Sequence, residues 1–192
     1  MIRMLMASVF LVVGFSAARA VTIRDGSFEN PVVPEGQTQA FSKREKFGGW
    51  HVVGESGNIL LVGLGFSING VPFPAQKGNQ WVCLTGNTRT QTGVQKKIAT
   101  TAGQKYELRF FVGNINDPAH GLGSQSTVRV FINSVFAGDA VNSNGDATHF
   151  VWKKAVLQFT ATSDETTIAF INEDDDTDNI NGLDHISLFT LP

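Results

Sequence analysis

The sequence has a single cysteine, Cys83, in 192 residues. One cysteine excludes an internal disulfide, and a lone cysteine is more often a small buried hydrophobe than a reactive thiol. There is no Walker loop, no HExxH zinc motif and no CxxC pair. None of the four histidines has metal-ligand spacing to another. We therefore expect ordinary surface or core positions, and no zinc ligation, for His51, His120, His149 and His185.

Basic residues are also scarce. Lys and Arg number 15 against 17 Asp and Glu, and they are scattered, with no cluster longer than the short pairs Lys43-Arg44, Lys96-Lys97 and Lys153-Lys154. A duplex-binding domain needs a basic stripe that releases phosphate counterions. We therefore expect no nucleic-acid partner.

Long hydrophobic runs are confined to the N-terminus. Leu5 to Phe15 is apolar, follows Arg3 and precedes Ala18-Arg19-Ala20, which is the layout of a secretory signal. We predict cleavage after Ala20, one domain over residues 21–192, and export to the periplasm or the cell exterior. A retained amphipathic anchor is the alternative, but this segment does not alternate polar and apolar faces. No later run is long enough to insert the mature chain into a membrane.

Short stretches rich in Val, Ile, Phe, Thr and Trp recur between Gly, Asn and Asp clusters, without helical periodicity. This pattern predicts an all-β sandwich of about nine strands. The predicted strands are Gly49–Val53, Asn58–Val62, Gln80–Leu84, Gly93–Thr100, Lys105–Val112, Ser126–Ile132, Val151–Phe159, Thr166–Ile171 and Asp184–Leu191. Gly54–Gly57 is predicted to be a hairpin turn.

Alternation within the strands predicts the core, because neighbouring residues point to opposite faces. The set is Tyr106, Leu108, Phe110, Val128, Val130, Ile132, Val156, Phe159, Ile168, Phe170, Ile186 and Leu188. Val156 and Phe159 stand three apart and would need a bulge to share a side. Residues 63–78 and 113–125 form two long loops, which in a compact domain are usually functional or mobile.

An acidic run extends from Glu173 to Asp178, with Asp174, Asp176 and Asp178 at the spacing of a calcium loop. Asn179 stands where that loop needs glycine, and His185 stands where it needs glutamate. We favour a solvated loop, and ligation of a hard cation is the alternative.

Several segments share one family pattern, in order along most of the chain. They are Asp25–Pro31, Gly49-Trp50, Gly78–Leu84, Gly93–Gln95, Thr101–Leu108, Trp152, Phe159–Thr162 and Gly182–Leu188. Together they resemble the galactose-binding-domain-like superfamily of jelly rolls, in particular the domain of unknown function 642 family and the carbohydrate-binding modules of xylanases. The resemblance implies a jelly-roll β-sandwich of two antiparallel sheets.

The resemblance also implies a structural calcium ion between the first and last strands, held by Glu29 and Asp184. Calcium prefers several oxygen ligands, and bridging the chain ends would stabilise the folded state. The alternative is that both carboxylates accept hydrogen bonds from turns.

For the ligand, the resemblance implies a secreted, non-catalytic protein that binds a polysaccharide or another glycan. Trp81 and Cys83 depart from the family pattern, which has a small residue and an aspartate there. An aromatic plane near a groove can stack on a sugar ring, although a buried Trp is commoner. Candidate contacts are Trp81, Phe66, Phe73, Glu107 and Arg109, whereas Trp50 and Trp152 have structural roles.

Two further functions stay open. A protein-interaction or adhesin module of the cell surface would use the same fold without binding glycan, with a surface protein as partner. A hydrolase is the least favoured, because 17 acidic residues allow many pairs of carboxylates and the sequence selects none.

Overall fold

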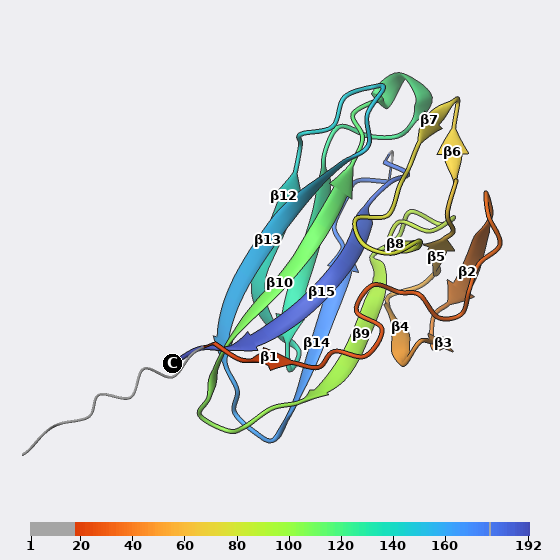
Figure 1. Cartoon of the computed structure of the whole chain (residues 1–192). Coiled ribbons are helices and arrows are strands. Elements are labelled where there is room, and N and C mark those ends of the chain that lie inside the picture. Colours follow the sequence, from red (N-terminus) through yellow and green to blue (C-terminus); the bar gives the residue numbers. More distant parts are fainter. Residues whose placement is uncertain (1–17, 177) are drawn as a thin grey trace, which may run out of the picture.

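The computed structural model describes residues 18–176 and 178–192, and consists of two antiparallel sheets packed face to face (Figure 1). Sheet A has the order β13 (Val151–Thr160), β10 (Lys105–Asn114), β15 (Gly182–Thr190), β8 (Trp81–Cys83), β5 (Asn58–Val62) and β2 (Thr38–Ser42), and β1 (Ala20–Val21) also pairs with β15. Sheet B has the order β12 (Val135–Asn142), β11 (Ser126–Ile132), β14 (Glu165–Asn172), β9 (Thr92–Ala99), β4 (Trp50–Gly54) and β3 (Lys46–Phe47).

Two small elements lie outside these sheets. Strands β6 (Ser67–Ile68) and β7 (Val71–Pro72) form a separate hairpin, and Pro118–His120 is a single 3-10 turn, η1. Within the described ranges, no helix is long and apolar enough to span a membrane.

The predicted all-β jelly-roll sandwich is confirmed, and each of the nine predicted strands is present with its ends within two residues of the prediction. The number nine is wrong, because the described residues contain fifteen strands. Six strands lack a counterpart among the nine predicted. Four of the six are only two residues long, β2 exposes every residue except Phe41, and β12 buries only Asn142. Such segments carry no hydrophobic alternation that a sequence could display.

The core lies between the two sheets, and most of the predicted set belongs to it. Val156 is the exception. Strand β13 pairs with β10 without a bulge, so Val156 stands opposite Arg109 on the outer face of sheet A and is 52% exposed. Phe159 has the opposite parity, points inward and stacks on Tyr106 with ring centroids 5.5 Å apart.

The two ends of the domain lie side by side, as the resemblance implied. Ala20 and Val21 pair with β15, and the Ile186 amide donates to the Gly26 carbonyl at 2.7 Å. The first seventeen residues of the predicted signal lie outside the described residues. Residues 54–57 do not form the predicted hairpin, because β4 belongs to sheet B and β5 to sheet A.

Candidate functional site

The outer face of sheet A carries a second hydrophobic cluster. Val82 and Leu84 point into the main core, so Trp81 and Cys83, which alternate with them, point outward. The long loops 63–78 and 113–125 fold over this face and supply apolar side chains. The buried members of the outer cluster are Val62, Phe73, Trp81, Cys83, Ile115, Leu122, Phe150 and Ile180.

Aromatic rings fill the centre of the outer cluster. The Trp81 ring lies 5.0 Å from Phe150 and 5.8 Å from Trp152, measured between centroids. Its indole N–H donates to the Phe73 carbonyl at 3.1 Å. Trp81 and Phe73 are therefore fully buried, and neither is the open stacking platform that we considered from the sequence. Trp152 is partly buried against the same cluster, in keeping with a structural role.

Beside Trp81 lies a cavity of about 320 Å³, the outer pocket. Side chains of β5 and β8 line it on the sheet side, and Phe66 and Ile68 belong to the β6 segment. Polar groups come from β2 and from two loops. The lining residues are Thr38, Leu60, Val62, Phe66, Ile68, Trp81, Cys83, Gly86, Asn87, Arg89, Asn179 and Ile180. None of these lining residues is a carboxylate or a histidine.

Hydrogen bonds hold the polar side of the outer pocket in place. The Arg89 amide donates to the Thr85 carbonyl at 2.9 Å, and the Arg89 guanidinium donates to the Asp176 carbonyl at 3.2 Å. The Thr85 hydroxyl donates to the Asn179 carbonyl at 2.7 Å, which joins the two loops. Burial raises the pKa of the Cys83 thiol, so this side chain is an uncharged part of the lining.

Glu107 and Arg109 lie on the same face of sheet A but away from the outer pocket, since β15 separates their strand from β8. They pair with each other, with Arg109 Nε donating to Glu107 Oε1 at 2.6 Å. That hydrogen bond lowers the pKa of Glu107. The Arg109 guanidinium also lies 4.2 Å from the Phe189 ring centroid. The structure thus brings Phe66 and Trp81 together at one pocket and leaves Glu107 and Arg109 outside it.

Glu29 and Asp184 bind the same segment of backbone. Glu29 Oε1 accepts from the amides of Asn79 and Gln80 at 2.9 and 3.1 Å. Asp184 Oδ2 accepts from the amides of Gln76 and Lys77 at 2.8 and 2.9 Å. This is the turn hydrogen bonding that we gave as the alternative to calcium. Glu29 Oε2 takes part in neither of the Glu29 hydrogen bonds, so a carboxylate oxygen remains with which a cation could be held.

Burial raises the pKa of Asp184 to about 7. Over the part of the chain that the structure describes, no group of three or more His, Cys, Asp or Glu is arranged to hold a metal ion. The calcium site at Glu29 and Asp184 stays a prediction.

The acidic run is not a solvated loop throughout. Asp178 is only 4% exposed and accepts from the Ile180 amide at 2.9 Å, while Asp174 accepts from the Thr127 amide at 2.5 Å. Burial raises the pKa of Asp178 to about 7, and burial together with the nearby Asp178 charge raises that of Asp174 to about 8. Both line a second cavity of about 300 Å³ beside residues 123–125. The sequence showed the charges but gave no sign of their burial.

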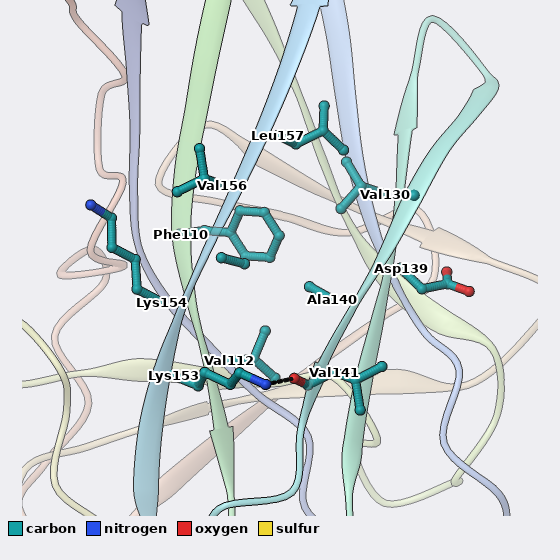
Figure 2. Close-up of a pocket in the computed structure, with 12 residues that line it drawn as sticks. Phe110, Val112, Val130, Asp139, Ala140, Val141, Lys153, Lys154, Val156 and Leu157 are labelled. Carbon is teal, nitrogen blue, oxygen red and sulfur yellow. Dashed lines mark hydrogen bonds between the residues drawn. The ribbon is translucent and has the colours of Figure 1, made fainter.

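A third cavity, of about 240 Å³, lies where the edges of the two sheets meet, between β12 and β13 (Figure 2). Core residues Phe110, Val112 and Val130 line it, and Lys153 reaches across to donate to the Val141 carbonyl at 2.9 Å. It is an opening onto the main core, and the outer pocket is the candidate functional site.

The two antiparallel sheets and their strand order define an all-β jelly-roll sandwich. The chain belongs to the HpiC1-like family, whose model, described as HpiC1 cyclase, matches residues 19–188. The matching family is not the domain of unknown function 642 family, so that closer kinship stays a prediction. No curated protein matches the chain.

Solved structures resemble the chain in fold. The K3 cleaved adhesin domain of Lys-gingipain from Porphyromonas gingivalis is 14% identical, with a TM-score of 0.54, over 90% of this chain and 99% of that one. A family 35 carbohydrate-binding module from Clostridium thermocellum is 13% identical, with a TM-score of 0.49, over 81% and 99%. A xylan-binding domain from Paenibacillus barcinonensis is 13% identical, with a TM-score of 0.46, over 83% and 97%.

Proposed function

We propose that this protein binds a carbohydrate in the outer pocket and does not catalyse a reaction. The observation that carries the proposal is the lining of that pocket, which combines apolar and aromatic side chains with a few polar groups on a fixed scaffold. This composition is typical of small-molecule sites. It suits a sugar, which presents C–H groups to an apolar surface and hydroxyl groups to amides and guanidinium.

Each part of the lining has a separate task. Phe66 is partly exposed and forms the apolar side on which a sugar ring would lie, and the buried Trp81 supports that side from beneath. Asn87 and Arg89 supply donors for ring hydroxyls. The buried Trp81 would shape the pocket and would not be an open platform.

The absence of acid–base groups from the lining favours binding over turnover. General acid–base catalysis needs a side chain that exchanges a proton near the working pH, within hydrogen-bond reach of the ligand. The lining offers the Cys83 thiol, whose pKa burial raises, and the permanently charged Arg89 guanidinium. Neither is suited to that task.

Retention on immobilised glycans and a glycan array tests the proposal. We expect the folded protein to bind at least one glycan, and Phe66→Ala to weaken binding about tenfold or more, the loss of about 1.4 kcal/mol. Val135→Ala, an exposed apolar position on β12, is the matched control and should bind like the parent. A blank array together with no retention on cell-wall polymers would overturn the proposal.

The proposal includes export, which rests on the signal-like layout of residues 1–20. Expression of the full-length chain in a bacterial host, followed by fractionation and N-terminal sequencing, tests it. We expect a periplasmic or extracellular product that begins at Val21. A cytoplasmic product that retains Met1 would contradict this part.

A cyclase is the second candidate function, because the family model is named for one. Ring closure by acid catalysis needs a carboxylic acid that is still protonated near neutral pH. Asp174 meets that requirement, since burial and the nearby Asp178 charge raise its pKa to about 8 and it lines the second cavity. The assay is conversion of alkenes bearing a nucleophilic group into products of unchanged mass and altered retention. Turnover that Asp174→Asn abolishes would establish this candidate.

A further inference from the structure

Four segments enclose the outer pocket. Its lining includes Thr38 of the edge strand β2, the β6 segment, the loop 86–89 and residues 179–180. Strands β5 and β8 form its floor. A groove that accommodates a passing polymer needs two open ends, so that the chain can enter and leave. Three of these segments lie above the sheet and the edge strand β2 borders the pocket within it, which is the geometry of a socket.

The enclosing segments are fixed in place. The Phe73 amide donates to the Phe66 carbonyl at 3.0 Å, and the two rings lie 6.0 Å apart, which anchors the β6 side. The Asn87 amide donates to Asn58 Oδ1 at 2.8 Å, which ties the 86–89 loop to the start of β5. The Asn179 side-chain amide donates to the Gly121 carbonyl. Widening the pocket into a groove would break several of these bonds.

The volume of the outer pocket also favours a closed site over a groove. About 320 Å³ is near the lower end of the range for small-molecule pockets, which begins at about 300 Å³. We infer that the pocket takes a single sugar ring end-on, either a free monosaccharide or the terminal residue of a glycan, and does not take an internal stretch. This inference rests on the proposed function.

Arg89 is the specificity-determining residue of this end-on site. It is the one charged side chain among the lining residues, and a guanidinium presents five N–H donors. One of these donates to the Asp176 carbonyl, which orients the group without using all its donors. The others can meet hydroxyls that only a terminal ring leaves free.

Partial hydrolysis of a polymer separates the two modes of binding. The competitors are soluble xylan, β-glucan and galactan, each used intact and partly hydrolysed. At equal mass, each competes with the best-binding immobilised glycan for the protein. End-on binding predicts that inhibition per unit mass rises with the number of chain ends, about tenfold for a tenfold shorter mean length, as mass action requires. Unchanged or weaker inhibition after hydrolysis would overturn the inference. If no polymer, fragment or monosaccharide binds, the proposed function itself fails.

Arg89→Gln should weaken binding of the best fragment about tenfold or more, because it removes a charge-assisted hydrogen bond to a sugar hydroxyl. Its thermal unfolding should match the parent. Arg44→Gln, at an exposed turn before β3, is the control and should leave affinity unchanged. Equal affinity of Arg89→Gln and the parent would remove Arg89 from this role.

Discussion

The two faces of sheet A bury side chains in different ways. The inner face packs regularly against sheet B, through alternating residues such as Leu108 and Phe110. The outer face is covered by loops over part of its area, where Trp81 and Phe73 are as buried as the inner core. Strand β8 takes part in both, and all three of its residues are buried.

A pocket can form on this scaffold where a sheet face is only partly covered. The inner face has a complete partner in sheet B and closes. The outer face has a partner only where the loops reach, and the outer pocket lies beside the loop-covered cluster, with β2 on its other side. The rigid inner packing holds the pocket floor, and the loops supply its polar groups.

The largest expected effect is a loss of unfolding free energy, which should differ between Phe→Ala substitutions on the two faces. Phe110→Ala on the inner face should lower the free energy of unfolding by about 3–5 kcal/mol, because packed strands of both sheets cannot close the cavity. Phe73→Ala on the outer face should lower it by less, about 2–3 kcal/mol, because the surrounding loop can relax into the space. Urea unfolding measures both. A larger loss for Phe73→Ala would reverse the comparison.

A second prediction concerns calcium binding at the segment that leads into β8. If Glu29 and Asp184 hold the ion, calcium at a hundred times its dissociation constant stabilises the fold by about 2.7 kcal/mol. The Tm of thermal unfolding should then be higher with calcium than with a chelator. In Glu29→Gln the two Tm values should be equal. A Tm that the chelator leaves unchanged removes the calcium site and leaves only the turn hydrogen bonds.

The buried carboxyls should make stability depend on pH. Asp174, Asp178 and Asp184 have folded-state pKa values raised to about 8, 7 and 7 from an ordinary 3.8. Between these values the folded state binds more protons than the unfolded state, so their stabilising contribution is complete below pH 4 and is lost as the pH rises through 7 to 8. Unfolding free energy from pH 5 to 8.5 measures this decline.

Asp174→Asn tests the source of that pH dependence. Asparagine keeps the acceptor for the Thr127 amide and removes the ionisation, so the decline should shrink, by about 4 kcal/mol over the interval. Asp164→Asn, an exposed position, is the matched control and should keep the slope of the parent. An unchanged slope in Asp174→Asn would contradict the burial of this group.

The smallest expected effect concerns the open part of the outer face. Val156 is exposed there, so Val156→Thr should change the free energy of unfolding by less than about 0.5 kcal/mol. Urea unfolding against Val130→Thr, at a buried position of β11, gives the contrast. A loss in Val156→Thr comparable to that in Val130→Thr would place Val156 in the core after all.

The sequence predicted the inner face well, because alternation is a local property. Tyr106, Leu108 and Phe110 share a face by parity alone, and Val82 and Leu84 likewise place Trp81 on the opposite one. Val156 was misassigned because Phe159, three residues on, has the opposite parity and is the true inward residue.

The outer face could not be predicted in the same way. The burial of Trp81 depends on Phe73 and Phe150, which reach it from separate loops. Asp174 and Asp178 have the composition of a solvated loop, and only packing beside Thr127 and Gly123 buries them. Long-range packing of loops has no period that a sequence pattern can display.

The three indole N–H groups provide the most direct test that the outer pocket is the ligand site. Trp50 reports on the inner core, Trp81 on the pocket and Trp152 on the covering loops, and their N–H groups donate to the carbonyls of Asp25, Phe73 and Pro74. Two-dimensional nitrogen–proton NMR resolves them during titration with the best-binding oligosaccharide. We predict that the Trp81 signal shifts most while the Trp50 signal stays in place. A Trp81 signal that does not move at saturating ligand would contradict the assignment of the site.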